Sequence, residues 1–93
     1  MIRSFKDSET EKIYLRGISR KLPLDIQQIA LRKLRMLNNS HNLNDLRIPP
    51  ANKLEKLSGD RAGQHSIRIN NQWRVCFIWK DGGAHDVEIT DYH

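Results

Sequence analysis

The feature that most constrains the fold of this chain is a change in the spacing of its apolar residues near Lys53. Before this point, between Leu24 and Asn38, apolar residues recur at the interval of an amphipathic α-helix. After it, apolar and polar residues alternate, which is the pattern of half-buried β-strands. The sequence therefore predicts an α+β domain, with helices in the first half and hairpin-linked strands in the second.

Two helices are expected in the first half. Ser8 and Glu11 have the spacing of a capping box, which predicts that the first helix starts at Ser8. Pro23 suits the first turn of the second helix, because its missing N–H costs nothing there. Lys33 falls within the apolar arc of this second helix, residues 24–38, and weakens the pattern.

The strands are expected to be joined by short turns. Asn70-Asn71 and Asp81-Gly82-Gly83 are typical of hairpin turns. Residues 54–57 form a short run before the turn at Ser58-Gly59-Asp60. The four expected strands cover residues 2–5, 64–69, 73–80 and 87–90.

Alternation gives the strand 73–80 two different faces. Trp73, Phe77 and Trp79 share one face, and we interpret this stripe as core rather than a base-stacking platform, because a small domain needs large buried areas. Arg74 and Cys76 lie on the other face. The single cysteine cannot form an internal disulfide, so a buried thiol is expected.

Length and charge narrow the classes of protein further. The 93 residues predict one domain, residues 1–93, and the net charge of +5 favours an anionic partner, although a soluble domain can simply be basic. No segment has the apolar length of a membrane span or a signal-peptide core, so we expect a cytoplasmic protein without a membrane partner. The four histidines lack zinc-ligand spacing, and no metal or other cofactor is expected.

The ending Asp91-Tyr92-His93, taken with Arg74, supplies the residue types that cleave RNA without a metal. His93 titrates near neutrality, and its terminal carboxylate and Asp91 favour an imidazolium that could donate a proton to a leaving oxygen. Tyr92 could orient a 2′-OH or a phosphate, or stack on a base. Arg74 could bind phosphate, or be a surface residue with a packed stem. Alternation separates Tyr92 from His93, so the two share a site only if the tail curls; a frayed tail without function is the alternative.

Several segments together resemble the HigB branch of the RelE/ParE toxin superfamily. They are the run from Leu57 to Ile67, the strand 73–77, and the ending 91–93, in the same order of elements. The resemblance covers essentially the whole chain, including residues 2–5, and residues 47–55 are similar to the subgroup that includes the GraT toxin. It implies a RelE-like β-α-α-β-β-β order, with two N-terminal helices packed on one face of a mainly antiparallel sheet.

The resemblance also implies an activity. A HigB-like toxin of a type II toxin–antitoxin pair enters the ribosomal A site and cleaves mRNA. The catalytic residues of the family fall on Arg74, Tyr92 and His93, with the preceding aspartate on Asp91. The implied partner is a HigA-like helix-turn-helix antitoxin, and operator DNA is reached only through that antitoxin.

The chain departs from some HigB toxins at two positions. Glu55 stands where they have a histidine, and Ser58 stands where they have a lysine, so Glu55 becomes the candidate base and we expect mild toxicity. Four cations are candidates for RNA or ribosome contacts, which position a strand without reading its sequence. They are Lys53, Lys56, Arg61 and Arg68.

A non-cleaving inhibitor is the alternative reading. The ParE branch blocks DNA gyrase without the catalytic set, and the presence of Arg74, Tyr92 and His93 argues against that activity here. A basic module that binds the ribosome, or disturbs ribosome assembly without chemistry, gains weight from the departures at Glu55 and Ser58.

Overall fold

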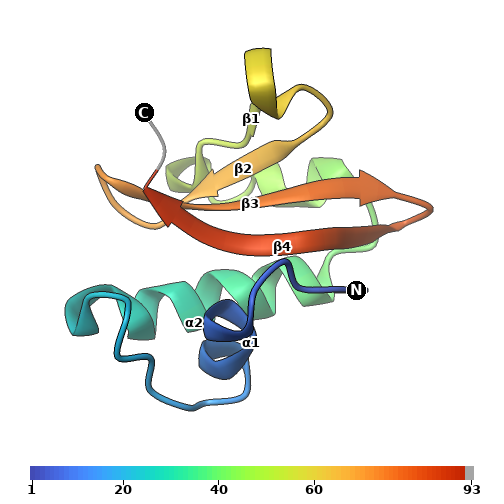
Figure 1. The fold of residues 1–93 in the computed structure, drawn as a ribbon. Coiled ribbons are helices and arrows are strands. Elements are labelled where there is room, and N and C mark those ends of the chain that lie inside the picture. The colour runs from blue at the N-terminus through green and yellow to red at the C-terminus, as the bar shows by residue number, and fades with distance from the viewer. Residues whose placement is uncertain (92–93) are drawn as a thin grey trace.

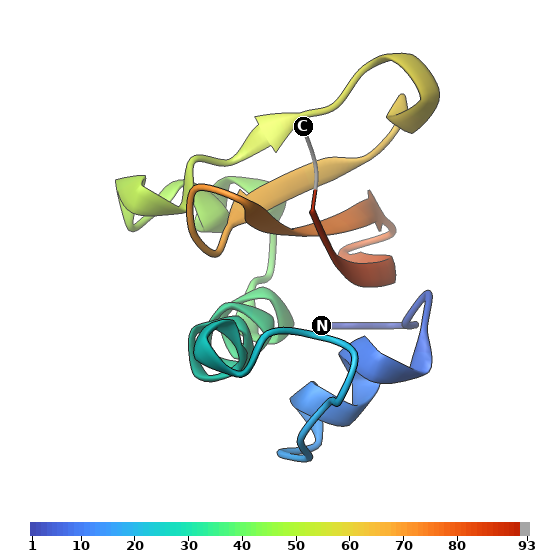
Figure 2. The same ribbon diagram turned by 60° about the vertical axis from the view of Figure 1, so that its left-hand side comes forward.

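Two helices and a four-stranded antiparallel sheet form two layers in the computed structural model, which describes residues 1–91 (Figure 1). Figures 1 and 2 both show α1 and α2 on the same side of the sheet. The helices are α1 (Ser8–Tyr14) and α2 (Leu24–Asn39), with 3-10 turns at Leu43–Arg47, Pro50–Asn52 and Gly59–Arg61. The strands are β1 (Glu55–Lys56), β2 (His65–Arg68), β3 (Trp73–Lys80) and β4 (Gly83–Asp91). The predicted α+β class is confirmed.

The strands follow each other in the sheet in chain order, β1-β2-β3-β4, and every neighbouring pair is antiparallel. The β3–β4 hairpin turns at Asp81 and Gly82, whose φ angles are 53° and 73°. Positive φ at both central residues gives a turn twist that matches the twist of the strands. The predicted Asp-Gly-Gly turn is therefore where the chain reverses.

The core lies between α2 and one face of the sheet. The amphipathic stripe of α2 packs against the alternate residues of β2, β3 and β4 that point toward it. Phe77 lies within this core, and Trp73 and Trp79 are partly buried against it. The aromatic stripe therefore belongs to the core, as predicted. The fully buried members from both layers include Ala30, Leu34, Leu37, Ile67, Val75 and Val87.

Residues 2–5 do not form the predicted strand. Ile2 and Phe5 make only isolated parallel bridges, to Ala84 and Val87 of β4. Strand β4 carries a register shift between these contacts, and Asp86 has a φ of 50° there. A bulge of this kind breaks the regular ladder, so the N-terminal segment can pair with β4 only in short pieces.

The helix starts also differ in detail from the predictions. Asp7 rather than Ser8 caps α1, since its Oδ1 accepts a hydrogen bond of 2.7 Å from the backbone N–H of Thr10. Pro23 precedes α2 instead of forming its first turn. Strand β4 begins at Gly83, four residues before the predicted start.

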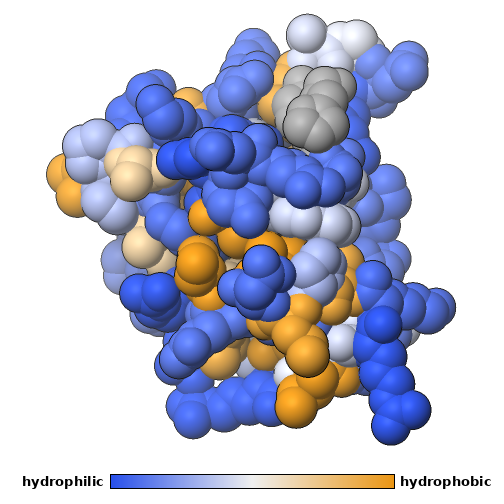
Figure 3. All heavy atoms as spheres, turned by 90° about the vertical axis from the view of Figure 1, so that its left-hand side faces the viewer, coloured by the Kyte–Doolittle hydropathy of each residue, from blue (hydrophilic) through white to orange (hydrophobic). Residues whose placement is uncertain are grey.

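Apolar side chains are exposed where α1 leads into α2. Leu15 and Ile18 are each 69% exposed, and Leu24 is 72% exposed. Figure 3 shows apolar atoms gathered on the lower part of one face of the molecule. Exposed apolar surface of this kind favours contact with another protein.

Candidate active site

The sheet has a second face, directed away from the helices, which we term the polar face. Glu55 lies opposite Ser66, and Ser66 lies opposite Cys76, so these three residues form one row across the strands. Arg68 and Arg74 form the next row, two residues along their strands. Cross-strand partners point to the same side of a sheet, so the register gathers charged and polar groups on this face.

The guanidinium of Arg74 is held at two points. Its Nε donates to Ser66 Oγ at 2.7 Å, and its Nη2 donates to the backbone carbonyl of Lys53 at 2.7 Å. Ser66 is fully buried, and the Arg74 side chain is 13% exposed. A guanidinium carries five N–H donors, so two hydrogen bonds within residues 1–91 leave part of the fork for an anion.

The backbone at Lys53 takes the left-handed conformation, with a φ of 45°, immediately after the 3-10 turn Pro50–Asn52. This conformation is costly for a residue other than glycine. It places the Lys53 carbonyl within reach of Arg74. Strained backbone that fixes a functional side chain is common at active sites.

Glu55 reaches Arg74 from the short strand β1. Its Oε2 is 3.8 Å from Arg74 Nη2, and its side chain is 51% exposed. An ion pair this exposed contributes little to stability. Its arrangement matters more for chemistry, because it brings together the candidate base and the candidate phosphate-binding group.

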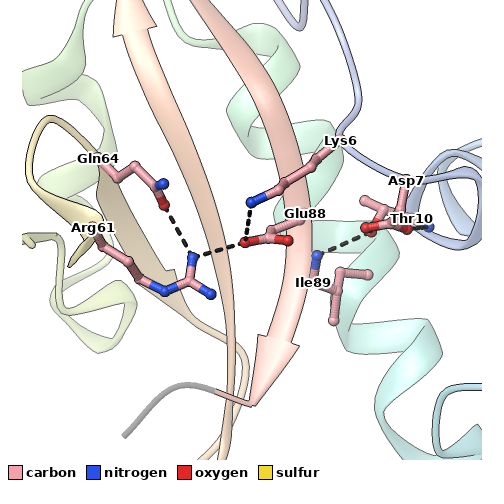
Figure 4. A network of polar contacts seen from close by, with 7 residues as sticks. All are labelled: Lys6, Asp7, Thr10, Arg61, Gln64, Glu88 and Ile89. Atoms are coloured by element: carbon pink, nitrogen blue, oxygen red, sulfur yellow. Dashed lines mark hydrogen bonds and ion pairs between the residues drawn. The ribbon is translucent and has the colours of Figure 1, made fainter.

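A second charged cluster, drawn in Figure 4, surrounds Glu88 of β4, which lies opposite Cys76 in the sheet. Arg61 Nη1 lies 2.7 Å from Glu88 Oε1 and also donates to Gln64 Oε1 at 3.1 Å. Lys6 Nζ approaches the same Glu88 oxygen at 3.7 Å. Arg61, a predicted RNA contact, is therefore already paired with a carboxylate.

Cys76 lies on the polar face and is fully buried. Burial raises the pKa of its thiol to about 11, while nearby Arg61 and Arg74 act in the opposite direction. A thiol with a raised pKa is a poor nucleophile at neutral pH. The predicted structural role of this cysteine agrees with its environment.

Within the described residues, the structure does not bring the predicted chain-end residue Asp91 to Arg74. Asp91 lies opposite Trp73, and so belongs to the side of the strands opposite to Arg74. Its Oδ2 accepts a hydrogen bond of 2.8 Å from Gln72 Nε2. Tyr92 and His93, the other two candidates, lie outside the described residues.

The remaining cations predicted to contact RNA are distributed over both faces. Lys56 lies opposite His65, one residue after Glu55, and therefore points away from the polar face. Arg68 lies opposite Arg74, and its Nη2 donates to Asn71 Oδ1. Lys53 is exposed, in the segment that precedes β1.

The end of β4 is tied to the helical layer. Thr10 Oγ1 accepts a hydrogen bond of 3.0 Å from the backbone N–H of Ile89, and Thr10 Oγ1 in turn donates to Asp7 Oδ2 at 3.2 Å (Figure 4). Thr10 is fully buried. The capping aspartate of α1 thus helps to fix the strand that leads into the predicted catalytic ending.

Two supporting residues were not identified from the sequence. Ser66 holds Arg74, and Glu88 holds Arg61 and Lys6. A signal for Ser66 existed, because alternation puts this small polar residue on the same face as Arg68. Glu88 gave no comparable signal, since its partners are distant in the sequence.

Among residues 1–91, no helix is long and apolar enough to span a membrane. Within the same residues, no group of three or more histidine, cysteine or acidic side chains could hold a metal ion.

Comparison of the whole chain with known proteins identifies close relatives. Residues 3–93 match the family of the RelE-like toxin of type II toxin–antitoxin system HigB. Toxin HigB-1 of Vibrio cholerae is 41% identical over 85 residues, covering 90% of each chain. Endoribonuclease HigB of Proteus vulgaris is 31% identical over 94 residues, covering 100% of each chain.

Solved structures support the same fold. The YoeB–YefM complex from Staphylococcus aureus contains a chain that matches with a TM-score of 0.61 and 17% identity, covering 100% of this chain and 98% of that one. YafQ from E. coli matches with a TM-score of 0.56 and 13% identity, covering 98% of this chain and 93% of that one. With the family match over nearly its full length, the chain belongs to the HigB-like toxins, a RelE-like family of type II toxin–antitoxin systems.

Proposed function

We propose that this toxin is an endoribonuclease that cleaves mRNA on the ribosome without a metal ion. The observation that carries the proposal is the Arg74 guanidinium, fixed by Ser66 and Lys53 beside Glu55 on the polar face. A relative that is 31% identical over its full length is named an endoribonuclease. The fixed donors favour stabilisation of charge that develops on a phosphate in the transition state.

The proposed reaction is an internal phosphoryl transfer. The 2′-oxygen attacks the adjacent phosphorus, the bond from phosphorus to the 5′-oxygen breaks, and the products are a 2′,3′-cyclic phosphate and a 5′-OH. Glu55 accepts the proton of the 2′-OH, which Tyr92 helps to orient. Arg74 binds the phosphorane oxygens, and His93 protonates the 5′-oxygen, with Asp91 favouring the imidazolium.

The rate enhancement is divided between the toxin and the ribosome. General acid–base assistance contributes roughly 10²–10⁴-fold. Alignment of the message by the ribosome supplies much of the remainder, because a correctly held 2′-OH removes an entropic cost. Glu55 and Arg74 lie on the same face of the sheet, which suits a substrate that is presented as an extended strand.

The net charge of +5 supports binding to RNA phosphates. Arg68 lies opposite Arg74 in the sheet, and the backbone carbonyl of Lys53 holds Arg74. Lys56 would contact a strand that bends around β1. Arg61 would have to share its guanidinium between phosphate and Glu88.

We further propose a HigA-like helix-turn-helix antitoxin as the protein partner, with operator DNA bound only by that antitoxin. Membership of a type II toxin–antitoxin family supports a protein antitoxin. The YoeB structural neighbour is itself found in a complex with YefM. An activity on ribosomes would take place in the cytoplasm.

The test is cleavage of a defined message on purified ribosomes by the wild type, Arg74→Ala and His93→Ala. Arg74→Ala should lower the cleavage rate by roughly 10²-fold or more. Arg35→Ala is the matched control, since it removes the same charge from an exposed position on α2 and should change the rate by less than about twofold. Unchanged cleavage by Arg74→Ala would overturn the assignment.

A non-cleaving inhibitor is the second candidate, favoured by the position of Asp91 on the side opposite Arg74. Tight binding to ribosomes or their assembly intermediates, with an intact message, would support the binder. Inhibition of supercoiling by purified DNA gyrase would support a ParE-like activity instead.

A further inference from the structure

A pocket of about 300 Å³ opens between α2, the 3-10 turn Pro50–Asn52 and the end of β2. It is separate from the contacts that hold Arg74, although Arg68 borders both regions. Its lining is mainly apolar, contributed by Ile29, Met36, Pro49, Ala51 and Ile69. The same pocket is bordered by three cations, Arg32, Lys33 and Arg68.

Two of the three cations are held by neutral partners. Lys33 Nζ donates to Asn52 Oδ1 at 2.6 Å, and Arg68 Nη2 donates to Asn71 Oδ1. Asn52 is fully buried and donates from Nδ2 to the carbonyl of Leu46 at 3.1 Å, so the point that holds Lys33 is itself fixed. Within residues 1–91, none of the three cations forms an ion pair with a carboxylate.

This arrangement leaves positive charge uncompensated in a partly apolar setting. Burial lowers the pKa of Lys33, and the nearby charges of Arg32 and Arg68 lower it further. A carboxylate placed among these groups would offset both the burial and the repulsion. The pocket thus has two parts. Its apolar lining, which we term the floor, can hold an apolar side chain, and the cations at its border attract an anion.

We propose that the pocket binds an acidic, aliphatic peptide segment of a protein partner. A leucine- or isoleucine-like side chain would fill the floor, while flanking aspartate or glutamate carboxylates pair with Arg32, Lys33 and Arg68. RNA fits less well, because the lining contains no aromatic ring on which a base could stack. Identifying this partner as the antitoxin rests on the proposed function. The preference for an acidic, aliphatic peptide rests only on the lining of the pocket and its cations.

The pocket adjoins the Arg74 site through two segments. Arg68 lies directly opposite Arg74 in the sheet, and Ala51 is two residues from Lys53, whose carbonyl holds Arg74. A peptide in the pocket would therefore draw Arg68 away from RNA phosphates. Occupancy would compete with substrate binding without covering Glu55 or Arg74.

Fluorescence anisotropy with three labelled octamers tests the proposal on the full chain. The first peptide carries leucine and isoleucine among aspartates and glutamates, the second replaces the aliphatic residues with serine and glycine, and the third probe is oligouridine RNA. The variants are Arg32→Glu, which reverses a charge at the border, and Ala51→Phe, which fills the floor. Arg35→Glu makes the same charge change on an exposed position of α2 outside the pocket. Circular dichroism confirms that each variant folds.

The aliphatic acidic peptide should bind the wild type at least roughly tenfold more tightly than the polar acidic peptide. Its affinity should fall roughly tenfold or more in Arg32→Glu and in Ala51→Phe, but not in Arg35→Glu. Equal binding of the two peptides, no peptide binding, or equal losses in Arg35→Glu would overturn the proposal. So would a loss confined to the RNA probe. Peptide binding is measured without RNA cleavage. The proposed pocket and the proposed endoribonuclease activity can therefore be contradicted independently.

Discussion

The two faces of the sheet are built from the same strands and have opposite properties. The face toward α2 is apolar and covered, with Ile67 and Val75 wholly buried in one cluster with Leu34 of α2. The polar face carries Arg74 and Glu55, whose side chains form hydrogen bonds and ion pairs across neighbouring strands. Alternation along each strand thus separates the residues that hold the domain together from those that are available for chemistry.

This separation means that substitutions on the two faces should have different consequences. On the helix side the expected loss is in the free energy of unfolding, because apolar burial is the main favourable term. On the polar face the expected loss is in activity, because the hydrogen bonds there fix the position of the Arg74 guanidinium.

The largest expected effect is on the helix side. Leu34→Ala removes a fully buried side chain from α2 and should lower the free energy of unfolding by about 2–5 kcal/mol. Urea denaturation measures the loss. Leu24→Ala is the matched control, because Leu24 is 72% exposed and its truncation should cost little. Equal losses in the two variants would contradict the assignment of the core.

A smaller effect is expected on the polar face, at Ser66. Ser66→Ala removes the acceptor for Arg74 Nε and should lower the cleavage rate by roughly tenfold, about 1.4 kcal/mol. If Ser66 acts only by positioning Arg74, the same change in an Arg74→Ala background should have no further effect on the rate. Additive losses would show that Ser66 acts otherwise. Cys76→Ala, a buried neighbour on the same face, is the control.

The last expected effect is confined to alkaline pH and concerns Cys76. Burial raises the pKa of the folded thiol from 9.0 to about 11, so the native state keeps the proton to higher pH than the unfolded state. The resulting stabilisation is complete below pH 9 and is lost as pH rises through 11. The difference in unfolding free energy between wild type and Cys76→Ala should shrink across this window. Native alkylation as fast as alkylation in urea would contradict the burial of the thiol.

The parts of the fold that follow from local periodicity were predictable. The change of period gave the position of α2 and all of β3, because each depends on neighbours close in the sequence. The start of β4 was missed because its bulge breaks alternation: Ala84 and Val87 are both buried although they are three residues apart. Asp7 was overlooked as the cap because Ser8, beside it, has its own capping pattern.

The candidate site was less predictable, because its geometry depends on register between strands. Arg74 and Glu55 could be named from residue type and family resemblance, but their approach to 3.8 Å depends on how β1, β2 and β3 align. The support from Ser66 and from the Lys53 carbonyl depends on the same alignment. The side on which Asp91 lies is also a property of register, and no local pattern reveals it.

The hydrogen bond from Ile89 to Thr10 joins residues that are 79 positions apart, and Ser4 likewise accepts from Val87 at 3.0 Å. A growing polypeptide leaves the peptide-synthesising machinery from its N-terminus onward, so the first partner in each contact waits for one made much later. Long-range closure of this kind is slow compared with helix formation. The edge of β4 can therefore pair with the N-terminal segment only after residues as far as Ile89 have been synthesised, much later than α1.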